Sequence, residues 1–142
     1  MADVKKPIGQ DQGKGKKVLV VDDEPDLRMM FKDILGTFGY KTEEAGDGVE
    51  CLEMLTKETY DLILLDLMMP RMDGMETLTR IKQDPEKYGK APVLILTNLT
   101  SDVAIKEGFE RKADGYLIKT ELTPEQVVKE IEGALGKKKD KK

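Results

Sequence analysis

The chain has 142 residues, which is enough for one domain with a buried core. It contains no apolar run of about 18 residues and no signal-peptide pattern, so we expect a cytoplasmic protein without a membrane span. Histidine is absent, which excludes Ser-His-Asp and Cys-His nucleophilic sites and every histidine-ligated zinc site. The single cysteine, Cys51, excludes an internal disulfide and fits a reducing compartment.

Charge is distributed unevenly along the chain. Residues 1–17 carry five lysines and two aspartates, and residues 137–142 carry five lysines and one aspartate. The net charge of −4 therefore leaves −11 on residues 18–136, and this acidic body argues against a nucleic-acid partner. We predict that residues 1–16 are a disordered extension and that residues 137–142 are a solvated lysine-rich tail.

Five short segments, four of them largely apolar, are each followed by polar or turn residues and are predicted to be β-strands. The clearest is Leu62-Ile63-Leu64-Leu65, which runs directly into Asp66 and is followed by Pro70. A continuous apolar run of this kind indicates a strand buried on both faces of a parallel sheet. The segment at 41–45 is less apolar, so we expect it at the sheet edge. The predicted strands cover residues 17–21, 41–45, 62–66, 92–96 and 115–118.

Segments with apolar residues three and four positions apart alternate with these strands and are predicted to be helices. Pro25 suits the first turn of the first helix, and Gly39 its end. The third helix is broken near Asp84-Pro85, and Thr123-Pro124-Glu125-Gln126 is a capping-box start for the last, which we expect to end at Gly136. The apolar residues that indicate the five helices lie at 27–38, 49–55, 75–81, 103–109 and 127–135, beginning and ending with Leu27 and Phe38, Val49 and Leu55, Met75 and Ile81, Val103 and Phe109, and Val127 and Leu135.

The alternation of strands and helices with short links indicates βαβ units with right-handed crossovers. Strands that are apolar throughout require helices on both faces of the sheet. We therefore predict an α/β fold with a doubly wound, five-stranded parallel sheet in the order 2-1-3-4-5. This is a flavodoxin-like three-layer sandwich, and it would occupy residues 17–136.

Polar side chains lie at the carboxyl ends of four of the five predicted strands. Asp22 and Asp23 follow the first, Asp66 ends the third, Thr97 follows the fourth and Lys119 follows the fifth. Carboxyl ends of parallel strands meet at one edge, which is where open α/β sheets bind ligands. Three carboxylates crowded there repel one another or take up a proton, and a hard divalent cation such as Mg²⁺ relieves the repulsion.

A carboxylate beside a metal ion can attack phosphorus and form an aspartyl phosphate. The incoming phosphoryl oxygens need donors, which the Lys119 ammonium and the Thr97 hydroxyl can supply. Each group also has a structural interpretation, since Asp22 and Asp23 suit a helix start and Thr97 a turn. The presence of all these groups at one edge favours the chemical interpretation.

At this point the sequence resembles the receiver domain of two-component response regulators. The resemblance covers about residues 17–136 and rests on Val-Asp-Asp-Glu at 21–24, Leu-Ile-Leu-Leu-Asp at 62–66, Met-Pro-Arg-Met-Asp-Gly at 69–74, Leu-Thr at 96–97 and Tyr-Leu-Ile-Lys at 116–119. Two positions depart from the family pattern. Thr120 stands where the family usually has a proline in a cis bond, and Asn98 where it favours a small residue.

The resemblance implies a phosphoryl site at the sheet edge. Asp66 is implied as the phosphoacceptor, and Asp22, Asp23, Asp66 and the Met68 carbonyl as the surroundings of a bound Mg²⁺. Thr97 and Lys119 are implied as catalytic partners of the phosphoryl oxygens.

The resemblance also implies a switch and a signalling partner. Tyr116 matches the aromatic residue that moves inward as Thr97 is drawn to the phosphoryl group; judged alone, it would be a buried or half-buried packing residue. We expect a sensor histidine kinase or a histidine phosphotransfer protein as donor and a downstream protein target. Nucleic acid and membrane are not expected as partners, and the chain would be a monomer or a weak phosphorylation-dependent dimer.

The transfer and its reversal would be self-catalysed, so we do not expect an enzyme that turns over a small substrate. Because few residues follow the last predicted helix, we expect a receiver without an output domain.

Three other functions share parts of this pattern. A receiver-like interaction module that works without phosphorylation would keep the fold, but would not need Asp66, Thr97 and Lys119 together. A carboxylate-nucleophile phosphatase would want a second acid two residues after Asp66, where Met68 stands. A flavin-binding protein can share the architecture, but an acidic edge repels phosphate unless a metal is bound.

Overall fold

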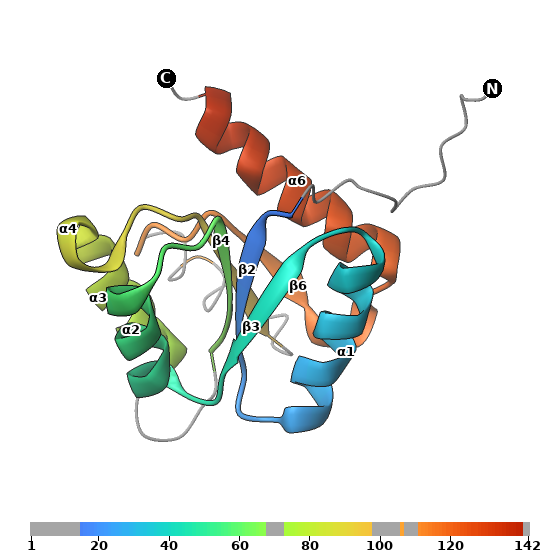
Figure 1. Ribbon diagram of the computed structural model, residues 1–142, viewed down its shortest axis with the longest axis horizontal. Helices are drawn as coiled ribbons and strands as arrows, with labels where there is room; N and C mark the ends of the chain where they lie inside the picture. The colour runs from blue at the N-terminus through green and yellow to red at the C-terminus, as the bar shows by residue number, and fades with distance from the viewer. Residues whose placement is uncertain (1–14, 68–72, 98–105, 107–110, 141–142) are drawn as a thin grey trace.

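The computed structural model describes residues 15–67, 73–97, 106 and 111–140. Within these ranges, five parallel strands form one sheet in the order β3-β2-β4-β5-β6 (Figure 1). This is the predicted 2-1-3-4-5 order, and it confirms the doubly wound fold. The strands are β2 (Lys17–Val21), β3 (Lys41–Ala45), β4 (Leu62–Asp66), β5 (Val93–Thr97) and β6 (Gly115–Ile118).

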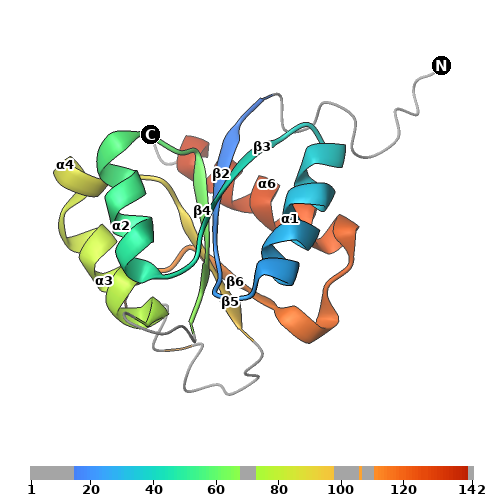
Figure 2. The ribbon, with the colours of Figure 1, turned by 60° about the horizontal axis from the view of Figure 1, so that its bottom comes forward.

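Helices cover both faces of the sheet and make the predicted three layers. Figure 2 shows the sheet nearly edge-on between the two groups of helices. One face carries α1 (Pro25–Thr37) and α6 (Pro124–Asp140); the other carries α2 (Gly48–Lys57), α3 (Gly74–Gln83) and the short α4 (Pro85–Tyr88). None of the helices in the described ranges is long and apolar enough to cross a bilayer.

Two apolar cores result from the alternation of side chains along each strand. Val18 and Val20 of β2 pack in the core beneath α1 and α6, which Phe31 and Ile131 help to fill. Leu19 and Val21 point to the opposite core, beneath α2 and α3. The central strand β4 is buried at every position, as the continuous apolar run predicts, whereas β3 lies at the edge and is partly exposed.

The helix ends confirm two local predictions. Gly39 has φ of 90°, and its N–H donates to the Gly36 carbonyl at 3.1 Å, while the Tyr40 N–H donates to the Leu35 carbonyl at 2.9 Å. This pair of bonds is a Schellman motif, in which glycine adopts the left-handed conformation at low cost. At the start of α6, the Thr123 hydroxyl accepts from the Gln126 N–H and the Gln126 side chain accepts from the Thr123 N–H, which is the predicted capping box.

Two predicted boundaries differ from those of the described structure. The Gly15 N–H donates to the Gly39 carbonyl at 3.0 Å and the Lys16 carbonyl accepts from Lys41, so hydrogen-bonded chain begins inside the segment assigned to a disordered extension. Helix α6 continues to Asp140 rather than ending at Gly136. A helical glycine costs only about 1 kcal/mol relative to alanine, and the lysines that follow are good helix formers, so Gly136 does not stop the helix.

One predicted helix break is also a helix start. Helix α3 ends before Asp84 as expected, but Asp84 then caps α4 by accepting from the Lys87 N–H, and Pro85 occupies the first helical position. The predicted helix marked by Val103, Ala104 and Phe109 lies outside the described residues.

Cys51 is completely buried in the core beneath α2, as a small packing residue. Burial raises the pKa of its thiol to about 12 from an ordinary 9.0, so the thiol is protonated at neutral pH. We expect iodoacetamide to label Cys51 about a thousandfold more slowly in the native protein than in urea, because the thiolate is that much rarer. Equal rates in the two states would contradict the buried position.

Candidate functional site

The register of the first and central strands brings two predicted site residues together. Val21 of β2 lies opposite Leu65 of β4, so the next residues along, Asp22 and Asp66, are neighbours at the carboxyl edge of the sheet. In Figure 2 the strands run down the page and this edge lies at the bottom. Asp66 is the last residue of β4, and only 3% of its surface is exposed.

The register of the last two strands adds the hydroxyl and the ammonium. Asp66 lies opposite Leu96 of β5, so Thr97 follows one position further along the edge and is buried. Thr97 in turn lies opposite Ile118 of β6, which places Lys119 directly after the pair. The predicted convergence of groups from four strands is therefore present in the fold.

Three carboxylates form the cluster that the sequence analysis predicts. Asp22, Asp23 and Asp66 each offer an oxygen, and these oxygens all lie within 4.8 Å of one another. Asp22 is completely buried, whereas Asp23 is exposed and opens the cluster to solvent. Like charges this close, two of them out of water, require a compensating cation.

Lys119 supplies part of that compensation. Its Nζ lies 2.9 Å from Asp22 Oδ2, 3.2 Å from Asp66 Oδ1 and 3.9 Å from Glu24 Oε1, and only 9% of its side chain is exposed. Burial lowers the pKa of the ammonium, but the contacts with Asp22 and Asp66 outweigh this effect, and the pKa lies above its ordinary value. Lys119 is therefore a fixed positive charge between two buried carboxylates at neutral pH.

The hydrogen bonding of Asp22 leaves room for a further cation. Its Oδ1 accepts from the Glu24 N–H at 2.9 Å. Its Oδ2 has the Lys119 ammonium nearby as an ion pair, but accepts no hydrogen bond of good geometry within the described part of the chain. A buried carboxylate oxygen with a lone pair to spare, beside two further carboxylates, fits a hard oxygen-seeking ion such as Mg²⁺. The Met68 carbonyl, the remaining predicted ligand, lies outside the described residues.

Helix capping does not account for these acids. Glu24 is the N-cap residue of α1, and its side chain makes no capping hydrogen bond. Asp22 reaches only the Glu24 backbone with one oxygen, while Asp23 and Asp66 share the cluster. Capping of α1 therefore does not explain why three carboxylates meet at this edge.

The two predicted switch residues lie on one face of the sheet. Tyr116 of β6 lies opposite Ile95, and Thr97 is two residues beyond Ile95 on the same strand, so the alternation of side chains places both on the face of α2 and α3. Tyr116 is 37% exposed, so its ring is partly buried and partly accessible to solvent. At Thr120, where the family usually has a proline in a cis bond, the Lys119–Thr120 bond is trans. A short 3₁₀ helix, η1 (Lys119–Glu121), begins there. The second departure, Asn98, lies outside the described residues.

Two residues that support the site were not predicted to do so. A Cβ atom at Gly74 would come within 2.9 Å of the Asp66 carbonyl carbon and 2.6 Å of Leu67 Cα, so only glycine allows α3 to start against the end of β4. Arg28 of α1 donates from Nη1 to the Asp22 carbonyl at 2.6 Å. The glycine directly after Asp73, the capping residue of α3, could have been identified from the sequence. Arg28 could not, because the sequence does not distinguish it from the other charged residues of the helices.

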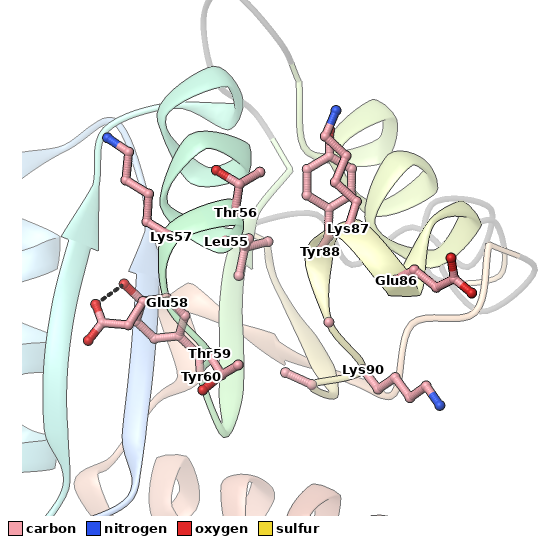
Figure 3. Close-up of a pocket in the computed structure, with 12 residues that line it drawn as sticks. Leu55, Thr56, Lys57, Glu58, Thr59, Tyr60, Glu86, Lys87, Tyr88 and Lys90 are labelled. Carbon is pink, nitrogen blue, oxygen red and sulfur yellow. Dashed lines mark hydrogen bonds between the residues drawn. The ribbon is translucent and has the colours of Figure 1, made fainter.

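A separate hollow lies at the opposite edge of the sheet. Figure 3 shows residues 55–60, from the end of α2 to the start of β4, facing residues 86–91 of α4 and the link to β5. The space measures about 640 Å³ and none of the predicted site residues lines it. The hollow is therefore not part of the acidic site.

Comparisons with known proteins agree with this geometry. The response regulator receiver domain matches residues 18–132. The chain is 37% identical over 136 residues to the gliding motility regulatory protein of Myxococcus xanthus, covering 93% of this chain and 17% of that protein. It is 34% identical over 119 residues to the transcriptional regulatory protein SrrA of Staphylococcus aureus, covering 84% and 47%.

Solved structures give the same result. The chemotaxis response regulator CheY4 of Vibrio cholerae superposes with a TM-score of 0.78 at 35% identity, covering 84% of this chain and 98% of that one. The chain belongs to the response regulator receiver domain family of two-component signalling. It spans less than half the length of the two curated relatives named above.

Proposed function

We propose that this chain receives a phosphoryl group on Asp66, in a Mg²⁺-dependent transfer from a sensor histidine kinase or a histidine phosphotransfer protein. The observation that carries the proposal is the arrangement around Asp66. Its buried carboxylate has an ammonium 3.2 Å away on one side and two further carboxylates within 4.8 Å. Strand packing does not need such a cluster, whereas phosphoryl transfer needs a nucleophile, a metal site and a cationic partner together.

The transfer proceeds by attack of an Asp66 carboxylate oxygen on the phosphorus of the donor. A phosphorus–oxygen bond forms as the phosphorus–nitrogen bond to the donor histidine breaks. The leaving imidazole keeps the bonding electron pair and is neutral when its other nitrogen carries the proton. The Lys119 ammonium can bind the phosphoryl oxygens on Asp66 with little movement, because its Nζ already contacts Asp66 Oδ1.

Asp22, Asp23 and Asp66 are the residues that would hold Mg²⁺, with the Met68 carbonyl as a further ligand. When bound, the ion offsets the negative charge of the carboxylates and of the phosphoryl oxygens. The spare lone pair of the buried Asp22 Oδ2 supports this assignment.

The signal is a protein–protein interaction controlled by the phosphoryl group. Thr97 contacts the phosphoryl oxygens with Lys119, and its movement draws the exposed Tyr116 inward on the same face of the sheet. A downstream protein that recognises this face reads the change. The chain acts in the cytoplasm, with self-catalysed transfer and dephosphorylation rather than turnover of a small substrate.

We expect acetyl phosphate, a small phosphodonor, to add one phosphoryl group to the wild-type protein when Mg²⁺ is present. Intact mass spectrometry should show the addition, and both EDTA and Asp66→Asn should abolish it. Asp61→Asn is the matched control, because Asp61 is a carboxylate next to the other end of β4, bonded to the Lys17 N–H. An unphosphorylated but folded wild type would instead favour the phosphorylation-independent interaction module, and equal addition to the Asp66→Asn protein would place the nucleophile elsewhere.

A further inference from the structure

Arg28 connects three parts of the fold at the base of the acidic cluster. Its Nε lies 2.9 Å from Glu44 Oε1 on β3, and its Nη1 donates to the Asp22 carbonyl at 2.6 Å. Its own backbone N–H donates to the Glu24 carbonyl in the first turn of α1. The side chain is largely buried, with 18% exposed, so the guanidinium is held in one place.

The carbonyl that Arg28 binds belongs to the peptide bond joining the two adjacent acids. Because a peptide unit is planar, the direction of the Asp22 carbonyl also sets the direction of the Asp23 N–H and the path of the chain into Asp23. The Asp22 N–H is already bound to the Ala45 carbonyl at 3.1 Å. The bond from Arg28 holds the other side of the residue, where the chain leaves the sheet.

Glu44 makes this arrangement compatible with a cation nearby. A guanidinium next to a metal site repels the metal unless its charge is balanced, and Glu44 balances it at 2.9 Å. Lys32 lies 3.6 Å from the other oxygen of Glu44, so the carboxylate keeps a cationic neighbour if Arg28 is replaced. Arg28 therefore offers the site a hydrogen-bond donor rather than a net positive charge.

We propose that Arg28 is a positioning residue for the Asp22–Asp23 pair, acting through the peptide bond between them to set the geometry of Mg²⁺ binding. The inference rests on the metal site of the proposed function. It differs from a purely structural role, in which the Arg28–Glu44 pair would only attach α1 to β3. The two roles separate because the hydrogen bond to Asp22 and the ion pair to Glu44 use different atoms of the same guanidinium.

The test compares Arg28→Met with Glu44→Gln. Arg28→Met removes both interactions, whereas Glu44→Gln removes the ion pair and leaves the hydrogen bond to Asp22. In metal-free protein, we expect the ¹H–¹⁵N resonance of the Asp23 amide to shift in Arg28→Met and to stay near its wild-type position in Glu44→Gln. In a Mg²⁺ titration, we expect Arg28→Met to raise the Kd about tenfold. Glu44→Gln should leave it within about twofold.

Equal effects of the two variants on both measurements, or no effect of Arg28→Met, would overturn the inference. The metal-free spectra keep this result separate from the proposed function. If the wild type binds no Mg²⁺, the metal assignment fails, and the Asp23 amide then decides by itself whether Arg28 holds the peptide. Unfolding curves of both variants show that the comparison is between folded proteins.

Discussion

Replacing Gly74 with alanine is expected to lower the free energy of unfolding by about 3 kcal/mol, the upper part of the usual range for overpacking. The new methyl group meets the carbonyl group of Asp66 and the Cα of Leu67, all of which are backbone atoms. No flexible side chain can move aside, so either α3 or the end of β4 must shift. We expect that shift to stretch the bond from the Gly74 N–H to the Leu67 carbonyl and to displace Asp66, so the proposed phosphorylation should be slower as well.

Gly133→Ala is the matched control for this effect. Gly133 lies within α6, and a Cβ atom there meets nothing within 4 Å. The same substitution should therefore stabilise the protein by about 1 kcal/mol, because alanine loses less backbone entropy in a helix. Urea denaturation of the two variants measures the change in the free energy of unfolding, which should be a loss in Gly74→Ala and a gain in Gly133→Ala. A Gly74→Ala protein as stable as the wild type would contradict the close approach of α3 to Asp66.

Lys119→Met is expected to destabilise the protein by about 3 kcal/mol at neutral pH, because it leaves two buried carboxylates without their shared cation. Adding Mg²⁺ should recover much of the loss, since a ligand that binds only the folded state stabilises it. Phosphorylation by acetyl phosphate should be slow even with Mg²⁺, because the phosphoryl oxygens lose their ammonium partner.

Lys82→Met is the control for Lys119→Met. Lys82 Nζ lies 2.9 Å from Asp114 Oδ2, but both side chains are partly exposed, so its loss should cost no more than about 1 kcal/mol. Lys119 does not balance the charge of the acidic cluster if the two variants lose equal stability. The same conclusion follows if Mg²⁺ does not stabilise Lys119→Met more than it stabilises the control.

The stability that Lys119 contributes changes with pH in a definite direction. The pKa of Lys119 is raised in the folded protein, so its stabilising contribution is complete below the ordinary value of 10.5 and is lost as the pH rises through the folded-state value. The wild type should lose this part of its stability in alkaline solution, whereas Lys119→Met has no such step. Urea midpoints measured on both sides of pH 10.5 test the difference.

The fold could be predicted because each signal was local. The apolar run ending in Asp66 specifies a doubly buried strand, and the Thr123–Gln126 capping box specifies a helix start without reference to distant parts of the chain. The neighbours of Asp66 followed from strand order alone. Asp22, Thr97 and Lys119 each come directly after a strand residue or end a strand, and parallel register brings such positions to one edge.

The parts that could not be predicted depend on contacts between elements. The sequence predicted Lys119 as a partner of phosphoryl oxygens. It did not predict that the ammonium lies between Asp22 and Asp66 when no phosphoryl group is present. The contact from Arg28 to the Asp22 carbonyl depends on how α1 packs beside β3, and the order of Gly15 depends on a bond to Gly39. Spacing along the chain carries no information about such distances.

The most direct test of the central claim is to locate the phosphoryl group. Treating the phosphorylated protein with borohydride reduces an acyl phosphate to an alcohol, which converts the modified aspartate to homoserine, and peptide mass mapping identifies the position. We expect homoserine at position 66 alone, only after incubation with both phosphodonor and Mg²⁺. Homoserine at position 22 or 23, or a phosphoryl group that leaves Asp66 unmodified, would contradict it.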